Sequence, residues 1–463
     1  MLNVANLLGP LALGLSALVA GYRLIRRHPE TVWTPYAWFL AAIVLFYSMG
    51  PLIYPLAGSR TLAYAQSLAP VDASQLLRTN LLNAVGILAL LVGFRIGRAW
   101  PRLRNRDAAG MRARSPALTK TVALTFLAIG GVLQYLVILP TQFGLYHLVM
   151  PGMIKNLGDL YLLGLMVLAY IVAKGSRAWQ LPFIGLWTLQ VVTSFLLFSK
   201  HQLILSIALP ALGAYLAHRR VSHLLAWSLV ICVVYFSVGQ LVLYGRTQIN
   251  AQTGDINHAT LMQRARIVRT WFQEGMPSAN AATSAGATGW ARLYYAPQQA
   301  FAMNRHDTGQ TGHTLRYLDI VLIPRLIWPG KPVISDMGAG FYELVTGRRG
   351  SHLAPGIFAE GYWDYGWPGV IGLGLIAGLA FGVLSSLSVG WMRRGAFEYL
   401  PGVLLGINMG IVGTTQFFVA SIVGATGFFF VYILVVWGVA QTFSGIRLRL
   451  ARSRLRPPAS DHG

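Results

Sequence analysis

Apolar residues occur along the chain in blocks long enough to cross a lipid bilayer. The hydrocarbon core of a bilayer is about 30 Å thick, and a helix needs about 20 apolar residues to cross it. Backbone amides in lipid must be satisfied within their own segment, so such blocks are expected to be helices. The pattern predicts about eleven spans, at residues 5–22, 36–56, 79–97, 119–139, 157–174, 180–198, 202–217, 224–244, 367–389, 399–417 and 421–442.

Composition agrees with this pattern, because 55% of the residues are hydrophobic and only 11% are charged. A soluble domain carries roughly 25% charged residues. The predicted fold class is an all-α polytopic membrane protein. The single cysteine, Cys232, lies in an apolar run, so disulfides contribute nothing. Residues 1–22 contain no Lys or Arg, so the basic region of a signal peptide is missing and we expect a retained first helix.

The positions of the basic residues predict the orientation. With the amino terminus outside, 22 of the 37 Lys and Arg residues fall into cytoplasmic connections and the tail, against four in the opposite short loops: Arg60, Arg78, Lys155 and Lys200. Cytoplasmic loops of membrane proteins carry such an excess. The amino terminus is therefore predicted to be periplasmic and the carboxyl terminus cytoplasmic. The net charge of +23 is then a topology signal and not evidence for nucleic-acid binding.

One long segment, residues 245–366, holds the other 11 basic residues and 8 of the 14 acidic ones. Long segments are translocated largely regardless of their charge. We therefore expect helices one to eight in residues 1–244, a periplasmic loop in 245–366, helices nine to eleven in 367–442 and a basic cytoplasmic tail in 443–463. Function is expected in the loop.

The loop has several features of a segment that folds against the bundle. Residues 260–274 place Leu261, Ala265, Val268 and Phe272 on one helical face, with Arg264, Arg266 and Arg269 on other faces, which is typical of an interfacial helix. Residues 276–289 are small and polar and predict a flexible connection. Residues 315–328 are apolar, too short to span and interrupted by Pro324, which favours a re-entrant or surface segment.

Glycines in the late helices predict close packing. Gly374, Gly378 and Gly382 are spaced four apart, as are Gly406 and Gly410. Small residues at this spacing let two membrane helices approach closely.

Several chemistries are excluded by the motifs that the sequence lacks. It has no Walker loop, Rossmann fingerprint, HExxH or CxxC motif, so we expect no cofactor and no metal. No helix interior carries the ladder of acidic and basic residues typical of ion-coupled transport.

Cationic side chains at the predicted outer surface form the first set of candidate residues. A guanidinium group forms paired hydrogen bonds with phosphate or pyrophosphate, and a lipid-linked pyrophosphate lies at this depth. The alternative is that these side chains reach ordinary phospholipid headgroups. The candidate substrate-binding residues are Arg246, Arg292, Arg325, Lys331 and Lys200.

Residues 351–370 form the second set. Glu360 and Asp364 are four apart, so a helix would present both carboxylates on one face, among several aromatic residues. Such a carboxylate could act as a base towards a sugar hydroxyl, and the alternative is an interfacial aromatic belt with capping acids. His352 with Glu360 could suggest a metal site, but a third ligand is missing.

Four segments, in their order along the chain, carry a family resemblance. They are FSKHQLILSIALPALGAYL (198–216), LYGRTQ (243–248), IPRLIWPGKP (323–332) and SHLAPGIFAEGYWDYGWPGVIG (351–372). They resemble the Wzy-type oligosaccharide repeat-unit polymerases, the O-antigen and exopolysaccharide polymerases of bacteria. The resemblance covers the carboxyl-terminal three-fifths best, whereas the first 120 residues match only as generic membrane helices.

The resemblance implies a multi-pass inner-membrane glycosyltransferase of lipopolysaccharide or exopolysaccharide biosynthesis. Such an enzyme acts at the periplasmic face, where it transfers a growing glycan from undecaprenyl pyrophosphate to a newly delivered repeat unit. The implied partners are the undecaprenyl-pyrophosphate-linked donor and acceptor, the bilayer and, as an open question, a chain-length regulator. No nucleotide sugar or ATP is required.

The resemblance also assigns roles to individual residues. Arg246 and Arg325 match arginines of the family's outer-loop motifs and would bind pyrophosphate, with Lys331, Arg292 and Lys200 as further members. Lys200 departs from the arginine that relatives often show. Glu360 matches the acid ahead of the final helices and would be the base or orient the acceptor, with Asp364 and His352 as alternatives.

Three other functions stay open from the sequence. An O-antigen ligase would share the donor and the membrane face but transfer the glycan to lipid A core. A transporter or flippase for lipid-linked sugars should show polar helix interiors and internal symmetry, and we find neither. A glycosyltransferase that uses a polyprenyl monophosphate sugar typically has acids in its first outer loop, which here offers only Asp72.

Overall fold

A computed structural model of the chain describes residues 4–56, 59–66, 70–104, 115–146, 157–253, 259–274, 293–321, 336–349 and 352–421, besides five single residues. Every regular element in this part of the chain is a helix, so the all-helical class is confirmed. Five helices are long and apolar enough to cross a membrane. They are α1 (Val4–Arg27), residues 73–99 of α5 (Ala73–Arg104), residues 116–142 in α6 (Pro116–Leu133) and α7 (Leu139–Gln142), residues 221–249 of α12 (Val221–Thr253) and α18 (Ile357–Arg393).

Shorter helices occupy five further predicted spans. They are α2 (Pro35–Ala42), which continues as a π-helical turn to Met49, α9 (Leu160–Ala173), α10 (Gln180–Leu196), α11 (Lys200–His218) and α19 (Leu400–Ile411). The predicted span at 421–442 lies outside the described residues, apart from Ser421 and Gly438. The number of crossings therefore stays a prediction.

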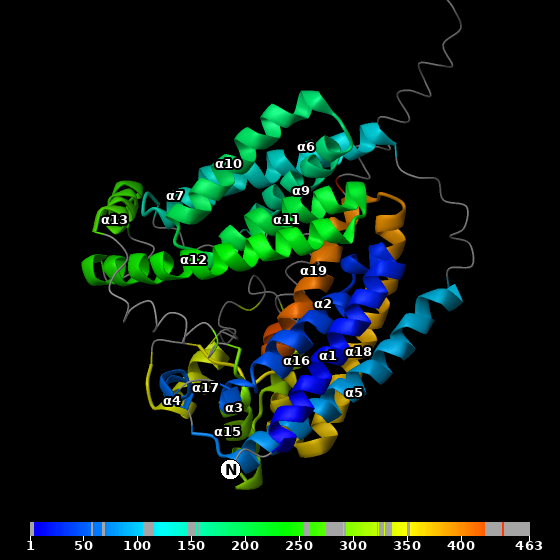
Figure 1. The fold of residues 1–463 in the computed structure, drawn as a ribbon, viewed down its shortest axis with the longest axis vertical. Helices are drawn as coiled ribbons and strands as arrows, with labels where there is room; N and C mark the ends of the chain where they lie inside the picture. Colours follow the sequence, from blue (N-terminus) through cyan, green and yellow to red (C-terminus); the bar gives the residue numbers. More distant parts are fainter. Residues whose placement is uncertain are drawn as a thin grey trace, which may run out of the picture.

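Two groups of helices build the molecule. In Figure 1, α6, α9, α10, α11 and α12 form the upper group, and α1, α2, α5, α18 and α19 form the lower right group. One buried cluster is centred on α9 and includes Phe126, Met166 and Leu212, together with Phe397 and Leu400 from the start of the α19 segment. The second cluster joins α1, α2 and α5 to α18. Since α19 residues enter the first cluster and α18 residues the second, the late helices connect the two groups.

Much apolar surface stays exposed on the outer faces of the long helices. Exposed side chains include Leu15 of α1, Leu88 of α5, Ile184 of α10 and Leu229 of α12. A soluble monomer rarely exposes apolar surface on this scale. Helices of this length with apolar outer faces are consistent with a membrane protein.

The close approach of α18 to α5 confirms the contact predicted from the glycine spacing. A Cβ atom added at Gly378 would lie 2.0 Å from the carbonyl oxygen of Leu90, and one at Gly382 would lie 2.4 Å from that of Phe94. In the reverse direction, a Cβ atom at Gly93 would lie 2.2 Å from the carbonyl oxygen of Leu375. Residues later in α18 contact residues later in α5, so the two helices run parallel. Gly410 makes the same kind of contact with Pro35, at 2.2 Å from its oxygen.

We expect Gly378→Ala to destabilise the protein, because its methyl group would overlap backbone that cannot move alone. Overpacking of this kind costs about 1–3 kcal/mol. The matched control is Gly372→Ala in the same helix, where an added Cβ atom has no neighbour within 4 Å. Thermal unfolding of both purified variants in detergent measures the difference. Equal melting temperatures for the two variants would contradict the packing of α5 on α18.

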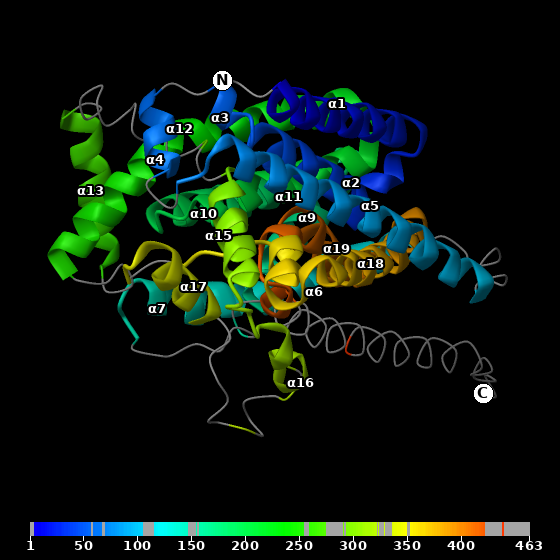
Figure 2. The same ribbon diagram turned by 90° about the horizontal axis from the view of Figure 1, so that it is seen from below.

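Small helices gather at one end of the molecule. Figures 1 and 2 show α3 (Ile53–Leu56) and α4 (Ser59–Gln66) near the amino terminus, α15 (Ala296–Asp307) and α17 (Asp336–Thr346) towards the same end, and α13 (Leu261–Glu274) at the end of α12. The short α16 (Leu318–Val321) follows a single 3₁₀ turn. Met303 of α15 and Phe341 of α17 enter the buried cluster of α5 and α18. The described part of the predicted loop therefore folds against the bundle, as expected.

The predicted loop is more helical than its sequence pattern indicated. Helix α12 continues to Thr253, and α18 begins at Ile357, so both helices enter the range assigned to the loop. The helix predicted at 260–274 is present as α13. Its Leu261 and Phe272 are exposed, as an interfacial helix requires, but Arg264 is 1% exposed and faces the protein. Residues 276–289 and most of 322–335 lie outside the described residues.

Candidate functional site

Two carboxyl groups lie together at the start of α18, as the spacing of Glu360 and Asp364 predicted. The Thr314 hydroxyl donates to Glu360 Oε1 at 2.7 Å and lies 3.2 Å from Asp364 Oδ2. A threonine hydroxyl has one hydrogen, so a proton on either carboxyl group would let that group donate to the threonine oxygen in turn. The three side chains can therefore share one additional proton.

Glu360 is fully buried, at 0% exposed. Its second oxygen accepts a hydrogen bond from the backbone N–H of Phe418, after α19. Asp364 Oδ2 accepts from the backbone N–H of Leu315 at 2.8 Å, whereas Asp364 Oδ1 is buried and has no hydrogen-bond partner among the described residues. Glu360 thus connects α18 to two other segments, and Asp364 is the less satisfied carboxyl group.

A break in α18 separates the segment that carries these acids from the membrane-crossing part. Gly366 has φ +64° and ψ −149°, a conformation that only glycine adopts readily. An added Cβ atom there would lie 3.1 Å from His306 Nε2. Pro368, two residues later, lacks an N–H donor and suits the start of a new helical segment. The sequence Tyr-Gly-Trp-Pro at 365–368 therefore sets the angle at which the acids face α15.

A second, more exposed network joins α5, α15 and α18 and includes Tyr362, which lies between the two acids in the sequence. Arg78 forms an ion pair with Asp307, and its Nη2 donates to the Tyr362 hydroxyl at 2.8 Å. That hydroxyl donates to Asp307 Oδ1 at 3.1 Å. The Arg78 guanidinium also lies 5.5 Å from the centre of the Tyr362 ring. The Arg78 and Asp307 side chains are each 37% exposed, so the network is accessible from outside the protein.

The loop after α15 is fixed to the start of α18. Trp363 Nε1 donates to the carbonyl oxygen of Gln310 at 3.0 Å, and Gly312 N donates to that of Trp363 at 3.1 Å. His306 Nδ1 lies 3.0 Å from the same Trp363 oxygen. A carbonyl oxygen can only accept, so Nδ1 carries the hydrogen. The other ring nitrogen of His306 is then the one available for proton transfer.

A buried pair of amides holds α15 against α5 beneath the network. Asn83 Nδ2 donates to Gln299 Oε1 at 3.0 Å, and Gln299 Nε2 donates to Asn83 Oδ1 at 2.9 Å. Both side chains are buried, at 4% and 2% exposed. Because each amide satisfies the other, the pair fixes the register of the two helices without leaving an unpaired polar group.

Two of the predicted cations lie at another corner of the molecule, where the α10–α11 turn meets α12. Arg246 Nε donates to the carbonyl oxygen of Phe198 at 3.1 Å. The Lys200 side chain lies against Gly239 of α12, where an added Cβ atom would be 2.8 Å from Nζ. The structure therefore brings Arg246 and Lys200 to one corner.

His352, the predicted alternative to Glu360 and Asp364, lies at α17. Its side chain is exposed and lies beside Gly338 of α17, 3.4 Å from a Cβ atom added there. Within the described residues, no three His, Cys, Asp or Glu side chains come together as metal ligands. The predicted substrate-binding residues Arg292, Arg325 and Lys331 lie outside the described residues.

Arg264 is a buried cation whose position the helical pattern of residues 260–274 did not predict. Its guanidinium donates to the carbonyl oxygens of Ala259 at 3.1 Å and Gln142 at 3.1 Å, and reaches that of Leu196 at 3.5 Å. Burial lowers the pKa of Arg264 to about 10. Two of these acceptors, Gln142 and Leu196, are at the ends of α7 and α10, so Arg264 joins α13 to two helix ends.

Arg78, His306, Asp307, Thr314 and Tyr362 were missed as site residues. Arg78 was noted only as one of four basic residues in outer short loops. Arg78 and Tyr362 are 284 positions apart, so no local spacing indicated their contact. The one available signal was an arginine near the start of an apolar helix, and it was weak because such side chains commonly reach the lipid interface.

Comparisons with known proteins found no match, whether to a family model, a curated protein or a solved structure. The functional assignment therefore rests on the residues and their geometry.

Proposed function

We propose that the chain polymerises oligosaccharide repeat units linked to undecaprenyl pyrophosphate, at the non-cytoplasmic face of a bacterial inner membrane. The proposal includes eleven crossings, with the amino terminus outside and the carboxyl terminus in the cytoplasm. The observation that supports it best is the accessible Arg78–Asp307–Tyr362 network on the same helical segment as the buried pair of acids. This network lies at the membrane end where the proposed topology has its periplasmic loop.

The reaction requires a cation for the leaving group and an acceptor for one proton. The bond between the anomeric carbon of the growing glycan and its pyrophosphate oxygen breaks, and that oxygen keeps the electron pair. The anomeric carbon bonds to a hydroxyl oxygen of the acceptor unit, whose proton passes to a base. Fixed cations that stabilise the departing oxyanion, together with a positioned base, supply the catalysis.

Arg78 suits the leaving group. Its contacts to Asp307 and Tyr362 both use Nη2, and a guanidinium group has five N–H donors on three nitrogens. A diphosphate can therefore bind while Tyr362 keeps the side chain in place. An incoming anion also competes with Asp307 for Arg78, and a released Asp307 carboxylate is an accessible proton acceptor.

Glu360 and Asp364 then act mainly as positioning residues. Both accept hydrogen bonds from the segment that begins at Thr314. Glu360 also accepts a hydrogen bond from the backbone N–H of Phe418. Their buried oxygens keep the loop after α15 beside the network. His306, fixed through Trp363, is the second group that could receive the proton.

A second cationic corner favours a polymerase over a ligase. A polymerase binds two lipid pyrophosphates, one on the donor and one on the acceptor, whereas a ligase binds one. Arg246 bonds to Phe198, which packs with Trp271 of α13, and the exposed apolar residues of that helix suit a lipid interface. We assign this corner to the second pyrophosphate, and Arg292, Arg325 and Lys331 stay predicted pyrophosphate-binding residues.

A bacterial strain that lacks the gene for this chain tests the proposal. We expect its lipopolysaccharide to carry single repeat units, since units are still made and transferred but not joined. Uncapped core with accumulated lipid-linked polymer would indicate a ligase instead. An unchanged ladder of chain lengths, or loss of all repeat units from the outer face, would contradict a role in joining them.

A further inference from the structure

Three helices end around a hollow at the membrane end opposite to the proposed catalytic site. The cavity is about 330 Å³ in volume and is lined by the carboxyl-terminal ends of α9, α11 and α18. In Figure 1 the ends of α11 and α12 lie beside the turn that follows α18. Met392, Phe397 and Leu216 are buried residues that form part of the wall. The cavity therefore belongs to the fold and is not a gap between surface side chains.

Basic residues from separate parts of the chain converge on this cavity. They are Lys174, His218, Arg219, Arg393 and Arg394. Arg393 pairs with Glu30, and the Lys174 ammonium lies 5.8 Å from the centre of the Tyr170 ring. Cations near helix carboxyl ends are individually favourable, but several of them around one hollow repel each other. An anion inside the cavity would relieve that repulsion.

Phosphate is the anion that this lining suits. Guanidinium groups bind phosphate oxygens through paired, charge-assisted hydrogen bonds, and lysine adds a compact charge. Basic pockets between membrane helices on the cytoplasmic side are suited to anionic lipid headgroups. The cavity is at the low end of the size range of small-molecule sites, which is about 300–1,000 Å³.

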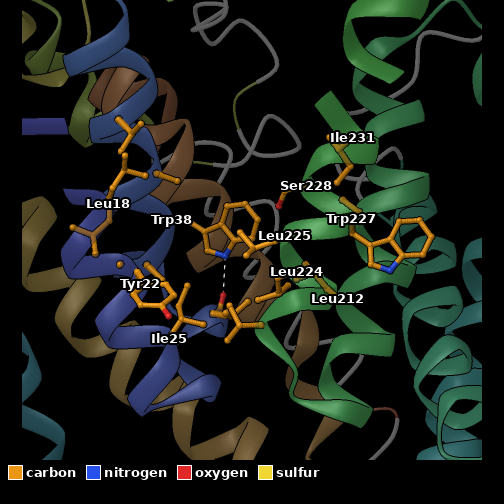
Figure 3. A pocket seen from close by; sticks show the side chains of 18 of the residues that line it. Leu18, Tyr22, Ile25, Trp38, Leu212, Leu224, Leu225, Trp227, Ser228 and Ile231 are labelled. Atoms are coloured by element: carbon orange, nitrogen blue, oxygen red, sulfur yellow. Dashed lines mark hydrogen bonds between the residues drawn. The ribbon is translucent and has the colours of Figure 1, made fainter. Parts of the chain in front are cut away.

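A second, apolar hollow adjoins the basic cavity and indicates a lipid as the source of the phosphate. It has a volume of about 380 Å³ and lies between α1 and α2 on one side and α11 and α12 on the other (Figure 3). Leu212, which lines this groove, is four residues before Leu216, which lines the basic cavity. Residues four apart lie on one helical face, one turn from each other. The two hollows therefore follow each other along α11.

The walls of the groove offer hydrocarbon contacts and few polar ones. Leu18, Tyr22 and Ile25 of α1 face Leu224 and Leu225 of α12 across it (Figure 3). The one indole N–H drawn with a hydrogen bond, that of Trp38, donates to the carbonyl oxygen of Val32 at 2.8 Å. Such a groove fits an acyl chain. A free phosphate ion would use the basic cavity alone.

We propose that these two hollows bind one anionic phospholipid, with its phosphodiester in the basic cavity and an acyl chain in the apolar groove. The site lies at the opposite membrane end from Arg78, so it is separate from the proposed catalytic function. The lipid would join α9, α11 and α18 at their ends and stabilise the contact between the two groups of helices.

The test uses the full-length protein in detergent, with thermal unfolding measured against added lipid. Dioleoyl phosphatidylglycerol is compared with dioleoyl phosphatidylcholine, and glycerol phosphate supplies the headgroup without acyl chains. The double variant Lys174→Gln/Arg219→Gln removes two charges from the cavity. The matched control, Arg177→Gln/Arg220→Gln, removes two charges from the same two connections at residues that do not line the cavity.

We expect phosphatidylglycerol to raise the melting temperature of the wild type and the control, and to bind the cavity variant at least about tenfold more weakly. Phosphatidylcholine and glycerol phosphate should give little shift. Equal weakening in both double variants would overturn the proposal, because a diffuse surface charge would then explain binding. A shift with glycerol phosphate as large as that with phosphatidylglycerol would overturn the lipid assignment. Any folding defect is visible in the melting temperatures without lipid.

Discussion

Arg78→Gln should reduce polymer formation by about 100-fold or more while the protein stays folded in the membrane. Removing one preorganised donor from a developing oxyanion typically has an effect of this size. Glutamine can still donate to Tyr362 but carries no charge for a diphosphate. The measurement is the distribution of glycan chain lengths in a deletion strain that expresses the variant at the wild-type level.

Arg349→Gln is the matched control for Arg78→Gln. Arg349 is paired with Glu343 at 2.8 Å, but its side chain is 86% exposed and lies outside the network.

A swap variant, Arg78→Asp with Asp307→Arg, separates catalysis from structure, since it re-forms the ion pair with the charges exchanged. We expect it to stay inactive. Wild-type chain lengths from the swap variant would assign Arg78 and Asp307 a structural role only.

Glu360→Ala should abolish polymer formation, again with the chain still inserted. The change leaves the Thr314 hydroxyl and the Phe418 N–H without their buried acceptor. Each buried donor without a partner costs about 1–3 kcal/mol. We therefore expect the loop after α15 to separate from α18, whereas the glycine contacts between α5 and α18 hold the helices. Chain-length ladders and the amount of protein in the membrane fraction measure the two effects.

Glu360→Gln decides between the two roles of this residue. Its amide oxygen can still accept from Thr314, so a positioning residue should keep partial activity in this variant. If Glu360 is the base, glutamine and alanine should be equally inactive. Glu343→Ala, which removes a half-exposed acid at the same end, should have no effect. Full activity of Glu360→Ala would exclude both roles.

The apolar helices could be predicted from the sequence because long apolar blocks favour helices whose backbone groups are paired within the segment. The sequence also predicted that Gly378 and Gly410 make close contacts, although spacing alone could not name Leu90 and Pro35 as the partners. The break at Gly366 was not predicted, and it makes Glu360 and Asp364 a separate helical segment. Helical periodicity describes one helix and carries no information about which helix lies beside it.

The site was predictable where it depends on local spacing. Glu360 and Asp364 share one face, and they contact the same threonine, as an interval of four residues indicates. Arg78 and Asp307 were not found, because they meet only through packing of α5 on α15. Arg264 was placed on a face other than the apolar one, and its burial was not predicted. Three backbone carbonyl groups allow it to be buried instead.

Reconstitution of the purified chain into lipid vesicles tests the central claim most directly. The vesicles are supplied with synthetic undecaprenyl-pyrophosphate-linked repeat units and contain neither ATP nor nucleotide sugars. We predict a ladder of lipid-linked oligomers, with one undecaprenyl pyrophosphate released for each unit joined, and no ladder from vesicles that contain Arg78→Gln. Folded wild-type protein that leaves the units unjoined, or Arg78→Gln that makes the same ladder, would contradict the account.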